Sequence, residues 1–193
     1  MYSSWNYETN LLETTFFFDD AQEQTMKFHI EDIFDIDRER YENEMFFDPE
    51  MNRHINESLK LGPKHLIEEI DNDEILYRKN LFSPKIDIPK SAKKLIRNKG
   101  LGYFESSTFY KGKHYANWSI KTEMFPDKIT GGGKFLFEEV GNKTRRIVQG
   151  EINAKMFGVG EIIERLIIQN LEENYEKITK VTKQWIKEHY SND

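Results

Sequence analysis

The stretch at residues 157–190 constrains the fold most, because it sustains an apolar helical period over many turns. The residues on one face recur at steps of three or four: Ile163, Ile167, Asn170, Asn174, Ile178, Val181 and Trp185. The opposite face is charged, with acids early and lysines late, as the helix dipole prefers. A helix of roughly 45 Å with one apolar face needs a broad partner. We therefore expect a sheet beneath it.

Seven earlier segments have the composition of strands: residues 25–35, 64–70, 74–82, 102–110, 114–125, 134–140 and 143–156. Alternation is clear in two of them, where Trp118 and Ile120, and then Val148 and Ile152, share the inward faces. Short turns connect most of the consecutive strands, which is typical of an antiparallel sheet.

Two short helices are predicted after the first strand. Asp37 can cap the first helix, and Asp48 followed by Pro49 is a strong start signal for the second. Gly62 and Pro63 would end that second helix. The predicted fold class is α+β: an antiparallel curved sheet of about seven strands wrapped on a long C-terminal helix. Residues 25–190 would form a single domain, and residues 1–24 an aromatic-rich N-terminal arm.

Composition narrows the classes of function. The chain has 193 residues, 32% of them charged, a net charge of −6 and no cysteine. Disulfides and thiolate sites are excluded, and an acidic chain argues against nonspecific nucleic-acid binding. The five histidines are scattered without metal-ligand spacing, so neither a metal nor a cofactor is expected. The N-terminus has no signal-peptide pattern, and we expect a cytoplasmic protein.

Two short motifs have plain interpretations. The glycines of Gly131-Gly132-Gly133-Lys134 lack the phosphate-loop spacing and are expected to form a flexible entry to a hairpin. Lys143, Arg145 and Arg146 form the basic end of another hairpin, available to an acidic partner unless Glu138 and Glu139 balance it.

The segment GEINAKMFGVGEIIE, residues 150–164, resembles the final strand, glycine bend and helix start of a START-like family of unknown function. Its ending is also similar to PRELI-type lipid carriers. The element order resembles the helix-grip fold of the START-like (SRPBCC) superfamily, although the N-terminal arm and a basic insertion at residues 89–98 depart from it. The resemblance implies a cavity between helix and sheet for apolar or amphipathic small molecules.

The candidate ligand-binding residues are the inward-facing ones of this arrangement: Trp118, Ile120, Phe135, Phe137, Val148, Ile152, Ile163, Ile167, Asn170 and Asn174. Aromatic and aliphatic side chains line most ligand pockets, but they would equally fill an ordinary core. The two asparagines stand where a core would place leucine. They either bind a ligand head group or reach solvent at the edge of the stripe.

Three classes of function follow. The leading one is noncatalytic binding or transfer of a lipid or other hydrophobic molecule, with transient membrane contact through the basic residues 90–97 left open. The second is a cyclase-like enzyme in the same cavity, for which Glu123, His114 and Glu164 are the available acid–base groups. The third is an interaction or regulatory subunit that has a filled core and binds a protein partner through residues 1–24.

Overall fold

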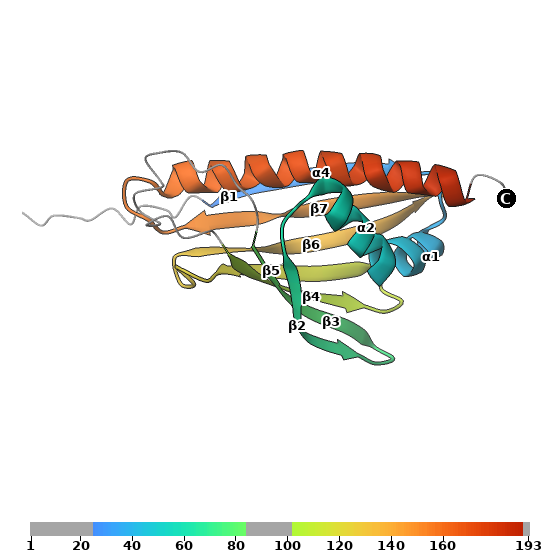
Figure 1. Cartoon of the computed structure of the whole chain (residues 1–193), viewed down its shortest axis with the longest axis horizontal. Helices are drawn as coiled ribbons and strands as arrows, with labels where there is room; N and C mark the ends of the chain where they lie inside the picture. Colours follow the sequence, from blue (N-terminus) through green and yellow to red (C-terminus); the bar gives the residue numbers. More distant parts are fainter. Residues whose placement is uncertain (1–24, 84–101, 191–193) are drawn as a thin grey trace, which may run out of the picture.

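The computed structural model describes residues 25–83 and 102–190, in which seven strands form one antiparallel sheet (Figure 1). The sheet order is β1-β7-β6-β5-β4-β3-β2. The strands are β1 Met26–Phe34, β2 Lys64–Asp71, β3 Ile75–Phe82, β4 Tyr103–Tyr110, β5 Tyr115–Thr122, β6 Ile129–Val140 and β7 Lys143–Ala154. The helix-grip α+β prediction is confirmed. The expected arm at 1–24 and the basic segment at 89–98 lie outside the described residues.

The long helix α4, Gly160–Tyr190, lies along β1 and β7 (Figure 1). Its most buried residues are Ile163, Glu164, Ile168, Thr179, Thr182 and Ile186. From Ile168 onward, each of these buried residues lies one position after the corresponding residue of the apolar face predicted from the sequence. The reason is that α4 turns Tyr175 and Thr179 toward Arg146 of β7, which is buried. None of the described helices has an apolar stretch that could cross a bilayer.

The start of α4 is fixed to the end of β7. The backbone N–H of Ala154 donates to the buried carboxylate of Glu164 at 2.7 Å. Gly158 has a positive φ of 74°, which favours glycine, and a side chain at Gly160 would collide with the Ala154 carbonyl. The glycine bend that the sequence resemblance implied matches this geometry, and the Glu164 carboxylate has a structural role.

The short helices bring aromatic rings over the sheet. Asp37 caps α1, Arg38–Arg40, and Asp48 caps α2, Pro49–Leu59, by accepting from the Met51 N–H at 2.7 Å. Between them lies η1, Tyr41–Phe46, a π-helical turn where the sequence predicted the continuation of a simple α-helix. The wider turn lets Tyr41 stack on Phe34, with ring centroids 4.7 Å apart.

The glycine-rich segment is not a hairpin entry. Gly131, Gly132 and Gly133 lie inside β6, which begins at Ile129 rather than at residue 134. Gly133 faces Gly150 across the ladder, and a Cβ at Gly150 would collide with Trp118 Cζ2 and with the Gly132 carbonyl oxygen. The glycines are therefore required by close packing of Trp118 and of the two strands, and the segment is extended rather than flexible.

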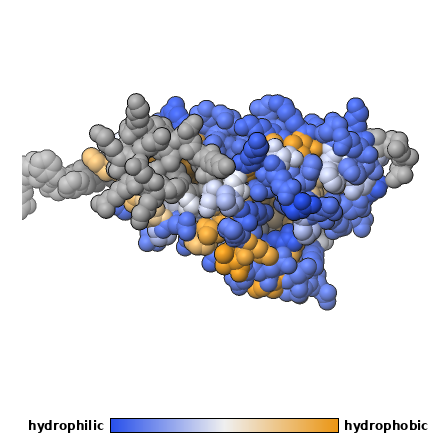
Figure 2. Space-filling view, viewed as in Figure 1, coloured by the Kyte–Doolittle hydropathy of each residue, from blue (hydrophilic) through white to orange (hydrophobic). Residues whose placement is uncertain are grey.

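The free edge strand β2 is the most exposed part of the sheet. All eight of its residues are exposed, including the apolar Leu66, Ile67 and Ile70. Figure 2 shows the corresponding apolar patch over the β2–β3 hairpin. This end of the sheet, unlike the β1–β7 end, is not covered by α4 (Figure 1).

Arg146 on β7 connects four elements inside the protein. Its guanidinium donates to Asp32 of β1 at 2.5 Å, to Thr179 of α4 at 2.8 Å and to the Tyr41 hydroxyl of η1 at 3.3 Å. Only 2% of Arg146 is exposed, so the predicted basic hairpin end is wrong for this residue. Arg145 does reach the surface, where it pairs with Glu138 and Glu31.

Replacing Arg146 with methionine should lower the free energy of unfolding by about 3 kcal/mol, because it leaves the partly buried carboxylate of Asp32 and the Thr179 and Tyr41 hydroxyls without their partner. Urea unfolding followed by circular dichroism measures the change. Arg145→Met, one residue away and at the surface, is the matched control and should unfold close to the wild type. Equal midpoints for the two variants would contradict the assigned role of Arg146.

Candidate ligand-binding cavity

A cavity of about 300 Å³ lies between the sheet, α4 and the short helices. Ligand pockets have volumes of about 300–1,000 Å³, so this one is at the small end of the range. The sheet wall has the period of two expected of strands. It comprises Arg78, Asn80 and Phe82 of β3; Tyr103, Glu105 and Ser107 of β4; Ala116, Trp118, Ile120 and Thr122 of β5; Phe135 of β6; and Arg146 and Val148 of β7.

The opposite wall comes from helices. The short helices contribute mostly apolar side chains: Tyr41, Met45, Phe46, Phe47, Met51 and Ile55. The helix α4 contributes residues spaced by three or four, namely Ile167, Asn170, Leu171, Asn174, Tyr175, Ile178 and Thr182. The lining also includes Asn52 and Asn56 of α2 and Lys64 of β2, so the cavity is lined mainly by apolar groups with polar side chains among them.

Seven of the ten residues selected from the sequence line this cavity: Trp118, Ile120, Phe135, Val148, Ile167, Asn170 and Asn174. The other three pack in the core away from it. Phe137 packs against Phe46 and Tyr41, Ile152 is fully buried in the main core, and Ile163 packs with Ile129 and Ala154 in a second cluster. Ile152 and Ile163 lie toward the start of α4, where helix and strand are in direct contact.

The two asparagines of α4 occupy the cavity wall rather than the solvent edge. The amide of Asn174 donates to the side-chain oxygen of Asn170 at 3.0 Å, one helical turn away. Both residues are partly exposed and line the cavity. Each amide uses one of its hydrogen-bonding groups in this pair, so the remaining groups can meet a ligand.

Glu105 and Tyr175, which sequence reasoning missed, form a polar cluster with Tyr103. Tyr103 and Glu105 are two residues apart on β4 and so share a face, while Tyr175 approaches from α4. Burial raises the pKa of the Glu105 carboxyl, opposed by nearby Lys64, and burial also raises the pKa of both tyrosines. The composition of β4 shows no clear apolar alternation, so no sequence signal indicated which residues face inward.

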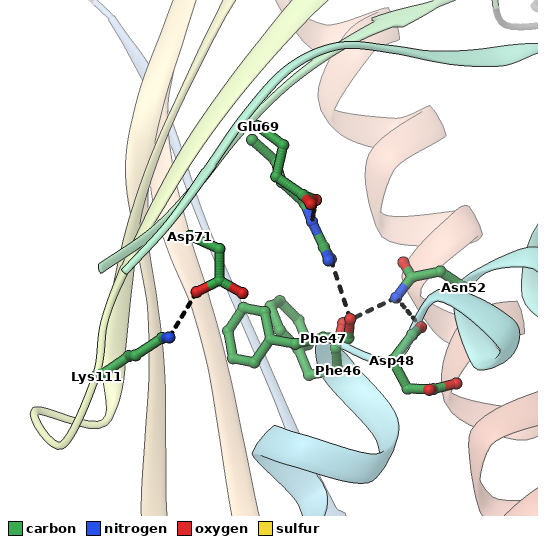
Figure 3. A network of polar contacts seen from close by, with 8 residues as sticks. Phe46, Phe47, Asp48, Asn52, Glu69, Asp71 and Lys111 are labelled. Atoms are coloured by element: carbon green, nitrogen blue, oxygen red, sulfur yellow. Dashed lines mark hydrogen bonds and ion pairs between the residues drawn. The ribbon is translucent and has the colours of Figure 1, made fainter. Parts of the chain in front are cut away.

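Arg78 fixes the short helices to the sheet, and Figure 3 shows its partners Glu69 and Phe47 together with Asn52. It donates to the backbone carbonyl of Phe47 at 3.0 Å and pairs with Glu69 of β2 at 2.7 Å. Asn52 on α2 donates to the carbonyls of Phe46 and Asp48 at 2.9 and 2.8 Å. These bonds hold the η1–α2 connection across one side of the cavity.

The three acid–base candidates from the sequence do not line the cavity. His114 lies 3.0 Å from the carboxylate of Glu42, which is buried in η1. Glu123 is exposed beyond the end of β5, and Glu164 accepts the Ala154 N–H. Glu105 is the carboxylic acid among the described residues of the wall.

The family described as "Protein of unknown function (DUF2505)" matches residues 34–186. The chain belongs to this family. Among curated proteins, none matches the sequence. The DUF2505 match extends from the end of β1 to the last turns of α4, so it covers every element that encloses the cavity.

Solved structures similar to this DUF2505 chain share its fold. The protein TTHA0849 from Thermus thermophilus is 12% identical, with a TM-score of 0.57 over 86% of this chain and 100% of that one. Norcoclaurine synthase from Thalictrum flavum is 14% identical, with a TM-score of 0.57 over 96% and 100%. Ara h 8.0201 is 9% identical, with a TM-score of 0.58 over 86% and 100%. The fold is START-like, as the sequence resemblance predicted.

Glu105 should make stability depend on pH. Its pKa is raised above the ordinary value of 4.5, so the native state keeps a proton that the unfolded state releases as the pH rises. The wild type should therefore lose stability relative to Glu105→Gln once the pH exceeds about 4.5. Urea unfolding of both proteins between about pH 4 and pH 8 measures this difference. A difference that stays constant over the range would refute the burial of this carboxyl.

Proposed function

We propose that this protein binds a hydrophobic or amphipathic small molecule in the cavity and holds it without chemical change. The observation that carries the proposal is the mainly apolar cavity between α4, the short helices and the sheet. A filled core would have favoured the interaction subunit that acts through residues 1–24. We propose that residues 25–190 act as one binding domain.

The energetics support an apolar ligand. Burial of apolar surface contributes about 25 cal/mol per Å², so a chain that contacts Trp118, Phe135 and Ile167 gains affinity without strong polar contacts. Seven of the residues predicted from the sequence, these three included, are the proposed contacts because they line the cavity. A lipid chain is one such ligand, and transfer of lipids between membranes would use the same site.

The ligand would enter past the η1–α2 connection. Within the described part of the chain, the polar contact that joins this connection to the β2–β3 side of the sheet is the bond from Arg78 to the Phe47 carbonyl. A segment held by few contacts opens at lower cost than the core strands do. Movement of α2 would expose the cavity and leave Arg146 with its partners on β1, η1 and α4 in place.

A cyclase-like enzyme is the second candidate, and Glu105 is the observation that favours it. Burial raises the pKa of this carboxyl, and a carboxylic acid with a raised pKa inside a cavity is suited to general acid–base catalysis. Norcoclaurine synthase, named for an enzymatic activity, has the same fold. Recovery of a bound molecule unchanged after long incubation supports the binding function, whereas conversion of that molecule supports the enzyme.

Filling the cavity should abolish binding. Ser107 of β4 is a small residue of the cavity wall. In Ser107→Phe the added ring takes up space in the cavity, so the probe loses contact with the apolar wall. Binding of a neutral fluorescent probe such as Nile red should weaken by at least about tenfold. Ser119 of β5 is exposed outside the cavity, and Ser119→Phe is the matched control. Ala154 of β7 is also small, but it packs with Ile129 and Ile163 and does not line the cavity, so enlarging it would not test the site.

Fluorescence titration measures both variants, and circular dichroism checks that each one folds. Probe binding that is unchanged in Ser107→Phe, or equally reduced in Ser119→Phe, would show that the probe binds elsewhere.

A further inference from the structure

We propose that the ligand carries an uncharged hydroxyl head group that lies among Tyr103, Glu105 and Tyr175. This inference rests on the proposed function, since it names the chemical class of molecule that the cavity selects. This class of ligand comprises long-chain or polycyclic alcohols, in contrast to fatty acids and amines.

The three polar side chains line the same cavity from two of its walls. Tyr103 and Glu105 come from β4 and Tyr175 from α4, and the three groups are close enough to interact electrostatically. None of the three makes a hydrogen bond to another side chain or to backbone in the described structure. All three remain partly exposed while they line the cavity. Their hydrogen-bonding groups are therefore free to meet a ligand.

Two of the fixed charges of the wall are paired, Arg146 with Asp32 and Arg78 with Glu69. Lys64 is the charged group whose field acts on Glu105, and it is exposed. Glu105, whose pKa is raised, offers an ammonium head group no fixed counter-ion, and a carboxylate head group would meet only the exposed Lys64. Burying a charge without a close partner is costly, and a neutral head group needs no such partner.

The titration behaviour of the cluster points the same way. Burial raises the pKa of Tyr103, Glu105 and Tyr175 and lowers that of Lys64, which is exposed overall but lies at the cavity wall. Each of these shifts favours the neutral form of the group. The surroundings thus disfavour charge in general, including charge carried by a ligand.

The cluster also disfavours a ligand without any polar group. A hydrocarbon against Tyr103 and Tyr175 would take their hydroxyls out of contact with water and leave them unpaired, at a cost of about 1–3 kcal/mol for each group. A tyrosine hydroxyl and a protonated carboxyl both donate and accept hydrogen bonds. A ligand hydroxyl, which also does both, can bond to them in either direction. Three groups without a hydrogen-bond partner among the described residues, each able to donate and accept, therefore match an alcohol better than an ester or an alkane.

The test compares decanol, decanoate and decylamine, which share an alkyl chain and differ in head group. Displacement of Nile red at neutral pH gives the three affinities. Decanol should bind at least about tenfold more tightly than either charged compound, because one unpaired buried charge costs more than about 1.4 kcal/mol.

Variants locate the head group. Tyr103→Phe and Tyr175→Phe should each weaken decanol binding by about threefold to tenfold, which is the loss of one hydrogen bond. Tyr110→Phe, on the same strand but outside the cavity wall, is the matched control and should bind decanol as the wild type does. Glu105→Gln keeps a neutral group that donates and accepts, so decanol affinity should be retained.

The outcomes separate this inference from the proposed function. If decanoate or decylamine binds as tightly as decanol, or if Tyr103→Phe and Tyr175→Phe bind decanol normally, the head-group assignment is wrong while the binding function stands. Weaker decylamine binding in Glu105→Gln together with amine preference in the wild type would identify Glu105 as the counter-ion of a cation. If neither Nile red nor any of the three compounds binds, the proposed function itself fails.

Discussion

The buried guanidinium of Arg146 is the interaction on which the arrangement depends. It holds β1, β7, η1 and α4 together through Asp32, Tyr41 and Thr179, and the ring of Phe34 lies 5.0 Å from its central carbon. An ion this deep is stable only while its partners remain in place. Any displacement of α4 or η1 would strand the charge, so Arg146 fixes both the helix and the start of the short-helix segment against the same strand.

The cavity follows from where α4 is held. The helix lies along β1 and β7, and the Glu164 carboxylate ties its first turns to the end of β7. The part of the sheet formed by β3, β4 and β5 is therefore left to the short helices, whose side chains cover it without filling it. The apolar side chains of β1 and β7 are buried against α4. Over β3, β4 and β5, part of the inner face of the sheet lines the cavity instead. The polar cluster of β4 faces that surface, which gives an otherwise apolar site a means of selecting among ligands.

Much of the fold was predictable from the sequence, and the errors have physical causes. The alternation through Trp118 and Val148 and the helical period of residues 157–190 are consequences of burial on one face, so they predicted the sheet and α4 correctly. The π-turn η1 and the extended glycines of β6 depend on ring packing between distant segments. Arg146 lies two residues before Val148, and the period of two already placed it inward. Its charge led to the opposite assignment, because a buried arginine requires partners that only the fold reveals. Glu105 had no such pattern around it.

The most direct test of the central claim is native mass spectrometry of the purified full chain, compared with its mass after denaturation. The cavity predicts a defined excess mass that disappears on denaturation and belongs to a small neutral amphiphile identified by extraction. For protein that emerges without a ligand, incubation with a mixed lipid extract should restore such a mass. A chain that takes up nothing from that extract, while the Ser107→Phe variant gives the same spectrum as the wild type, would contradict the account.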